Sequence, residues 1–303
     1  MRNKIKGLIA APNTPMHEDG SINLEMVPKY AKHLRDSGVA GVFVNGSTGE
    51  SLSLTFDERI ALAEAWSEHC DKNFKLIVHV GENSLPNACK LAAHAEKIGA
   101  CATGAIPPSF FIPGLKQVAD WYRALAAAAP SLPLYYYHMP AMSRVNIRIA
   151  DLFPLLRDVA NFAGAKYTFE DMMDLQVALE MDGGRFDVLM GRDEMLLSSL
   201  VVGAEGAVGS TYNYMAPVYT NIIESYKKGD ISGACKWQSL SHKLVQILNR
   251  APNGLACGKA ILTLCGVDVG PARQPLYKYT KADMESLKDS LAAIGFFDWK
   301  DGK

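Results

Sequence analysis

The chain has 303 residues, of which 49% are hydrophobic and 21% charged, as is typical of a globular protein with a sizeable core. Its formal net charge of -1 gives no indication of a nucleic-acid or membrane-surface partner. No apolar stretch is long enough to span a bilayer, and residues 1–6 lack the apolar run of a signal peptide. The six cysteines form no CxxC pair, so we expect free thiols in a reducing, cytoplasmic setting rather than a zinc site or disulfides.

Short apolar runs alternate with helical patterns along most of the chain. Strands are predicted at residues 7–11, 39–44, 75–80, 101–106, 134–137, 162–167, 186–190 and 206–208. Helices are predicted at residues 24–34, 55–66, 91–98, 118–129, 149–159, 172–181, 194–202 and 217–226. Thr55 and Glu58 have the spacing of a capping box, and Pro154 is expected to kink the helix that contains it.

Eight strand–helix units of this kind favour parallel strands closed into a (β/α)8 barrel, or TIM barrel. A doubly wound open sheet is the structural rival, but no GxGxxG follows the first strand. After residue 230 the strands stop, and helices are expected at residues 234–248, 257–264 and 282–294. We therefore predict a barrel over residues 1–230 that carries the active site, and a C-terminal helical extension over residues 231–303 that packs on it.

Lys166 lies inside the apolar strand at residues 162–167, where an ammonium group is costly to bury. One interpretation is a lysine whose chain reaches water at the end of the strand. The other is an amine that its surroundings keep uncharged, so that it attacks a carbonyl carbon. In a (β/α)8 barrel the active site lies at the C-terminal ends of the strands, so the residues at the other strand ends bear on this choice.

Polar residues follow several of these strands. Ser47 and Thr48 stand in a Gly-flanked turn, which fits either a carboxylate-binding site or an ordinary turn. Tyr137 ends the fifth strand, and alternation places it on the face opposite Tyr136. It is either a proton carrier at the barrel mouth or a core aromatic residue. The neighbouring His138 is as consistent with a structural hydrogen bond as with catalysis.

The last two strands end in a second polar group. Gly191, Asp193 and Glu194 follow the seventh strand, and Ser210 follows the eighth. A carboxylate pair beside hydroxyl groups fits the binding of a polyol. Asp193 is equally suited to capping the helix that follows it.

Considered together, these residues resemble a known family. The resemblance is carried by residues 46–50, Tyr137 with Pro140, residues 164–166, Gly191 with Asp193 and Glu194, and Gly209 with Ser210. It points to the N-acetylneuraminate lyase branch of the dihydrodipicolinate synthase family and runs along nearly the whole chain. It implies a barrel with a helical tail, assembled as a homotetramer. The implied activity is a lyase that splits N-acetylneuraminate (sialic acid) into pyruvate and N-acetylmannosamine without a metal or cofactor.

The resemblance also implies a role for each residue. Lys166 matches the lysine that forms an imine with pyruvate, and Tyr137 matches the residue that carries protons to and from the substrate. Ser47 and Thr48 match the pair that holds the pyruvate carboxylate. The positions that contact the sugar are matched by Thr168, Gly191, Asp193, Glu194 and Ser210.

Two departures from the family pattern affect the choice of substrate. Relatives of the synthase type carry an Arg five residues after the catalytic Tyr, and here that position is Met142, which favours a sugar aldehyde over an amino-acid semialdehyde. Many relatives carry a Tyr after the fourth strand that enters a neighbouring subunit's site, and here residues 109–111 contain no Tyr. The remaining alternatives are another pyruvate-dependent aldolase, acting on a sugar acid or a semialdehyde, and a keto-acid sensor without turnover.

Overall fold

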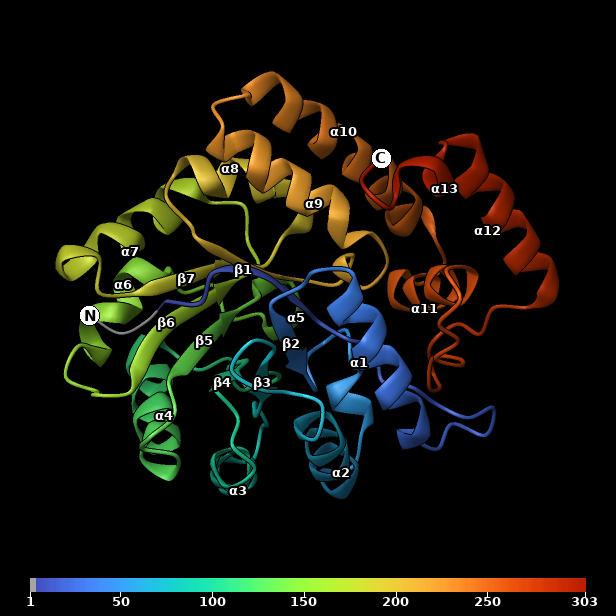
Figure 1. The fold of residues 1–303 in the computed structure, drawn as a ribbon. Helices are drawn as coiled ribbons and strands as arrows, with labels where there is room; N and C mark the ends of the chain where they lie inside the picture. Colours follow the sequence, from blue (N-terminus) through green and yellow to red (C-terminus); the bar gives the residue numbers. More distant parts are fainter. Residues whose placement is uncertain (1–3) are drawn as a thin grey trace.

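The computed structural model describes residues 4–303, so the first three residues of the polar N-terminal segment lie outside it. Eight parallel strands close into a barrel in sequence order, which excludes the open sheet (Figure 1). They are β1 (Gly7–Ala10), β2 (Gly41–Val44), β3 (Lys75–His79), β4 (Ala102–Ala105), β5 (Leu134–His138), β6 (Phe162–Tyr167), β7 (Asp187–Met190) and β8 (Gly206–Gly209). Pairing of β1 with β8 closes the barrel.

Helices surround the barrel and continue beyond it. The barrel helices are α1 (Val27–Asp36), α2 (Phe56–Ser67), α3 (Leu85–Lys97), α4 (Leu115–Ala128), α5 (Pro140–Ser143), α6 (Ile149–Leu152), α7 (Met172–Gly184), α8 (Leu196–Val201) and α9 (Tyr212–Lys227). The extension comprises α10 (Ile231–Arg250), α11 (Gly254–Leu264), α12 (Lys281–Ala293) and α13 (Phe296–Trp299). It lies to one side of the barrel, next to α1 and α9 (Figure 1).

Most predicted elements are present, and their boundaries follow local chemistry. Thr55 and Glu58 form the expected capping box at the start of α2. At Pro154 the chain changes from α6 to the 3-10 helix η3 (Phe153–Leu156), because proline cannot donate the hydrogen bond that would continue the α-helix. The last barrel helix was predicted to start at Pro217. Helix α9 begins at Tyr212, but it is broken at Met215, and the regular helix that follows the break starts just before Pro217. The short helices α5 and α13 were not predicted.

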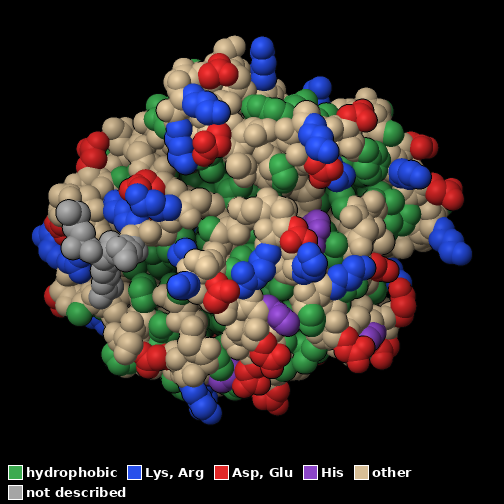
Figure 2. All heavy atoms as spheres, viewed as in Figure 1, with side chains coloured by type: hydrophobic (Ala, Val, Ile, Leu, Met, Phe, Trp, Pro, Cys, Tyr) green, Lys and Arg blue, Asp and Glu red, His purple; other side chains and the backbone are tan. Residues whose placement is uncertain are grey.

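The alternation of side chains along the strands creates two apolar layers. Phe43, Tyr135 and Tyr137 point into the barrel, where they pack with residues from the other strands. Tyr136 points outward into the larger layer between strands and helices, as the alternation predicted. Within residues 4–303, no helix is both long enough and apolar enough to cross a membrane. On the face that Figure 2 draws, basic and acidic side chains lie interspersed.

Candidate active site

Lys166 and Tyr137 are neighbours on adjacent strands. The register of β5 and β6 pairs these two residues directly, so both side chains point into the barrel at the same level. The Lys166 side chain is buried, and its Nζ lies 3.9 Å from the centroid of the Tyr137 ring and 4.5 Å from that of Phe43. The lysine therefore does not reach bulk water at the strand end. The two aromatic rings restrict where the amine can move.

The turn after β2 brings a hydroxyl group to the same point. Ser47 Oγ lies 2.8 Å from the hydroxyl oxygen of Tyr137. The backbone amides of Ser47 and Thr48 have no acceptor in the part of the chain that the structure describes. The turn itself is held by Thr14, whose hydroxyl donates to the Gly49 carbonyl at 2.7 Å. Two hydroxyl groups and two available amides form a site that fits a carboxylate.

All nine residues predicted from the sequence line one cavity of about 340 Å³ at the C-terminal ends of the strands. They are Ser47, Thr48, Tyr137, Lys166, Thr168, Gly191, Asp193, Glu194 and Ser210. Lys166, Tyr137, Ser47 and Thr48 come from β2, β5 and β6 and the turns after them. The other five follow β6, β7 and β8, so the cavity has one end that fits a carboxylate and a more extended polar end. Its volume suits a small organic acid with a polar chain.

The Asp193 side chain is held by Thr211, in the loop after β8. It does not cap the helix that follows it in the chain. Its Oδ2 accepts hydrogen bonds from the amide and the hydroxyl of Thr211, at 2.9 and 2.7 Å. Its Oδ1 is buried and has no hydrogen-bond partner within the described residues. Burial raises the pKa of Asp193 to about 6, although the Thr211 hydrogen bonds oppose this. An added Cβ at Gly209 would lie 1.7 Å from Asp193 Oδ1, so only glycine leaves room for the carboxylate there.

Thr168 and Gly191 are also closely fitted. Thr168 Oγ1 is buried and unpartnered among the described residues. A side chain at position 191 would place its Cβ 2.0 Å from that oxygen. The Gly191 amide donates to the Tyr167 carbonyl at 2.7 Å, which joins the ends of β6 and β7. Thr168 and Asp193 therefore each place a buried oxygen, unpartnered among the described residues, beside the cavity.

A buried pair, Arg59 and His79, lies next to Tyr137 and was not predicted. Arg59 is buried, and its guanidinium donates to the carbonyls of His79 and Gly81 at 2.9 and 3.0 Å. Burial, Arg59 and Lys166 together lower the pKa of His79 well below its ordinary range, so the imidazole is neutral. The His79 ring packs edge-on against the Tyr137 ring at 5.9 Å. A sequence signal for this pair was lacking, because Arg59 comes from the first turn of a barrel helix and not from a strand end.

Four other residues near the strand ends take no part in the predicted site. His138 points outward, stacks on Tyr167 with ring centroids 5.0 Å apart and has its pKa lowered by burial to about 4, which is a structural role. Met142 lines the cavity and is exposed, so no arginine holds a second carboxylate there. Phe110 and Phe111 are exposed on the connection between β4 and α4.

The extension completes one wall of the cavity. Asn249 of α10 and Leu255 and Gly258 of α11 line it, together with Asn13 from the loop after β1. Asn13 follows a strand and could have been found by the same rule as the other site residues. Asn249 could not, because nothing in the sequence shows that a helix 40 residues after β8 returns to the barrel mouth.

A buried primary amine beside a phenol, at the mouth of a (β/α)8 barrel, is the arrangement of enzymes that form an imine with a carbonyl substrate. Within residues 4–303, no group of three or more His, Cys, Asp and Glu side chains is arranged to hold a metal ion. The chain belongs to the dihydrodipicolinate synthetase family, because the model of that family matches residues 4–294.

Individual relatives agree with this assignment. The chain is 39% identical over 308 residues to N-acetylneuraminate lyase of Pongo abelii, covering 100% of this chain and 96% of the relative. The structure of the Proteus mirabilis N-acetylneuraminate lyase matches with a TM-score of 0.93 and 37% identity, covering 97% of this chain and 100% of that one. A catalytic lysine mutant of the Ruminococcus gnavus sialic acid aldolase matches with a TM-score of 0.93 and 32% identity, covering 99% of both chains.

Proposed function

We propose that this protein is a class I aldolase that cleaves N-acetylneuraminate into pyruvate and N-acetylmannosamine through an imine on Lys166. The observation that carries the proposal is the position of the Lys166 amine, buried against the Tyr137 ring and next to the Ser47 hydroxyl. Curated relatives about 39% identical over the full chain are N-acetylneuraminate lyases, which supports the same substrate. The solved Ruminococcus gnavus relative has a catalytic lysine, which supports the same chemistry.

Each bond change has a group to support it. The Lys166 amine condenses with the C2 ketone of the open-chain acid and releases water, which gives a protonated imine. Breaking the C3–C4 bond sends its electron pair into that imine and forms an enamine. The C4 hydroxyl gives its proton to the Tyr137 oxygen as the Tyr137 hydroxyl passes its own proton to the substrate carboxylate, and C4 becomes an aldehyde. The carboxylate returns this proton through Tyr137 to C3 of the enamine, and water then hydrolyses the imine to release pyruvate and restore the amine.

The other residues bind and orient the substrate in this proposal. Ser47 and Thr48 hold the carboxylate, which then lies beside the Tyr137 hydroxyl and can serve as its proton relay. Thr168, Gly191, Asp193, Glu194 and Ser210 line the part of the cavity that would take the sugar chain. No cofactor takes part, because the protonated imine is itself the electron acceptor.

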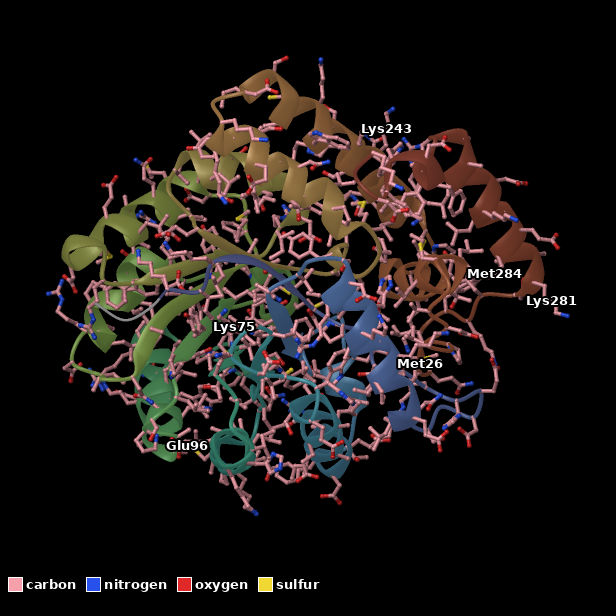
Figure 3. All side chains as sticks on the ribbon, in the orientation of Figure 1. Met26, Lys75, Glu96, Lys243, Lys281 and Met284 are labelled. Carbon is pink, nitrogen blue, oxygen red and sulfur yellow. The ribbon has the colours of Figure 1, made fainter. Side chains whose placement is uncertain are left out.

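Borohydride trapping with pyruvate tests the proposal. Reduction should fix one pyruvate-derived adduct on Lys166, identified by peptide mass spectrometry, and Lys166→Ala should lose both the adduct and turnover. Lys281→Ala is the matched control, because Lys281 stands at the start of α12 and extends away from the body of the molecule (Figure 3). An adduct on another lysine would refute the mechanism. A panel of sugar acids and semialdehydes tests the substrate, and absence of pyruvate release from all of them would favour a keto-acid sensor.

We also propose a homotetramer. Two separate apolar surfaces support it: Phe110, Phe111 and Ile112 on the β4–α4 connection, and Met173, Val177 and Val201 on α7 and α8. A tetramer of dihedral symmetry needs two different interfaces, and exposed apolar surface of this kind is typical of them. Light scattering that finds a monomer would refute this assembly. The six unpaired cysteines support a reducing, cytoplasmic location.

The division of the chain at residue 230 is part of the same proposal. Helix α9 ends at Lys227, and Asp230 caps α10 by accepting a hydrogen bond from the Gly233 amide at 2.8 Å. Residues 1–230 thus supply all eight strands and the catalytic side chains. Residues 231–303 form the extension that packs on this barrel and completes the cavity wall.

A further inference from the structure

The turn that carries Ser47 and Thr48 is held in an unfavourable backbone conformation at both ends. Asn45 and Glu50, which flank the turn, have φ angles of 61° and 60°. This left-handed conformation is disfavoured for residues with a Cβ and persists only where the surroundings impose it. Asn45 is fixed from within the barrel, because its side chain donates to the Arg59 carbonyl at 2.7 Å.

Glu50 is fixed from the extension instead. Its Oε1 lies 2.7 Å from Nζ of Lys259 on α11, with 0% of the Glu50 side chain and 2% of the Lys259 side chain exposed. Its Oε2 accepts a hydrogen bond from the backbone amide of Arg273 at 2.8 Å. Lys259 Nζ also donates to the Pro271 carbonyl at 2.6 Å. The carboxylate therefore has a partner at each oxygen, and both partners lie more than 200 positions later in the chain.

The chain that follows the turn is tied to the same segment. The Arg273 guanidinium binds both oxygens of Glu58 at 2.7 and 2.8 Å and donates to the Ser53 carbonyl at 2.7 Å. Glu58 is also the capping residue at the start of α2. The segment from Glu50 to Glu58 is thus fixed to the extension at three points.

The energetic cost of burying these two charges indicates that stability alone does not explain the ion pair. Burial lowers the pKa of Lys259, although Glu50 opposes this, so the charged form is expensive to hold in this place. An apolar pair of similar volume would give comparable stability without that cost. An apolar pair, however, cannot accept the hydrogen bond from the Arg273 amide, and so cannot fix the direction of the Glu50 backbone. The same helix, α11, places Leu255 and Gly258 on the cavity wall.

We propose that Glu50 and Lys259 are positioning residues, whose buried ion pair sets the turn so that Ser47 and Thr48 can hold the substrate carboxylate. This role rests on the proposed function. It makes the extension part of the keto-acid site, although none of its residues contacts the carboxylate in our proposal. The pair acts through the turn, so its loss should weaken carboxylate binding more than it slows chemistry.

The first test is Lys259→Met, which keeps the length of the side chain and removes its charge. The pyruvate concentration for half-maximal borohydride trapping, and the KM for N-acetylneuraminate, should rise about tenfold or more, the size expected when a hydrogen bond to a charged group is lost. The kcat should stay within about threefold of the wild type. Lys281→Met, the same change at an exposed site of the extension, should alter neither quantity. Unchanged half-saturation in a folded Lys259→Met variant would overturn the proposal.

A second variant separates positioning from stability. In Glu50→Leu with Lys259→Met both charges are replaced, so the thermal midpoint should recover toward that of the wild type. Carboxylate binding should not recover, because the Arg273 amide loses its acceptor. Recovery of both would show a purely structural pair and refute the role that we assign.

A double-mutant cycle with Ser47→Ala tests the route of the effect. If Lys259 acts through the turn, its substitution should cost much less in the Ser47→Ala background than in the wild type. Additive effects would overturn the proposal. If the wild type traps no pyruvate at all, the proposed function itself is refuted. That outcome is distinct from failure of the positioning role, because it is seen without any variant.

Discussion

Replacing Tyr137 by Phe removes one oxygen atom and leaves the rest of the site in place. The ring keeps its contact with the Lys166 amine at 3.9 Å and its edge-to-face packing with Phe43 at 5.7 Å. Ser47 loses its hydrogen bond to the Tyr137 hydroxyl. Because Ser47 lines the cavity, water can replace that partner, so the free energy of unfolding should fall by about 1 kcal/mol or less. Loss of a group that transfers the substrate proton should cost about a hundredfold or more in kcat, which is about 2.7 kcal/mol in the barrier.

The assay compares two steps in the same variant. Tyr137→Phe should still form the borohydride-reducible adduct with pyruvate, while release of pyruvate from N-acetylneuraminate becomes at least about a hundredfold slower. Tyr135→Phe is the matched control: it lies two residues earlier on β5, and its hydroxyl donates to Asp187 at 2.8 Å at the opposite end of the barrel. That variant should lose stability and keep near-normal turnover. Turnover of Tyr137→Phe within about threefold of the wild type would refute the proton-carrying role.

Three further substitutions test the charges and the close packing. The hydrogen bond from Arg273 lowers the pKa of Glu58 from 4.5 to about 2, so the Glu58 carboxylate stabilises the fold above pH 4.5 and this contribution is lost as the pH falls toward 2. In denaturant unfolding, the free energy of unfolding of Glu58→Gln should therefore fall less over that pH range than that of the wild type, by about 1 kcal/mol after solvent screening. Burial raises the pKa of Asp193 from 3.8 to about 6, so the free energy of unfolding of the wild type should fall relative to that of Asp193→Asn as the pH rises from 4 to 6, by up to about 3 kcal/mol. The same pH dependence in both proteins would contradict this. Gly164→Ala would place a Cβ 1.8 Å from the Asp187 carbonyl oxygen and should cost at least about 3 kcal/mol, whereas Gly229→Ala, with open space at a φ of 77°, should cost about 1 kcal/mol by thermal unfolding.

The sequence predicted the barrel and its polar rim because both depend on local regularities. Period-two and helical patterns located the eight units, and the rule that barrel sites lie at C-terminal strand ends selected the residues that follow them. Alternation along β5 separated Tyr137 from Tyr136, and the structure places them on opposite faces. The same rule applied to the first strand would have found Asn13, which lines the cavity.

The sequence could not predict what holds these residues in place. The ion pair between Glu50 and Lys259 joins positions 209 residues apart, and a lysine in an apolar helix gives no sign of its partner. From the sequence, Asp193 could equally be a helix cap. Its hydrogen bond from the Thr211 amide could not be predicted, because that contact depends on how β7 and β8 lie side by side. Positions of this kind are fixed by tertiary packing rather than by pattern.

The extension supports both ends of the cavity, which argues against treating it as an appendage. Through α11, Lys259 pairs with Glu50 at the end of the turn that carries Ser47 and Thr48. Through α10, Gln238 accepts the Leu197 amide at 3.0 Å and donates to the Asp193 carbonyl at 3.2 Å, while His242 lies 2.8 Å from the Glu194 carbonyl. The two loops are thus fixed to the consecutive helices α10 and α11 of the extension. Because one loop follows β2 and the other follows β7, the extension supports two separate parts of the cavity rim.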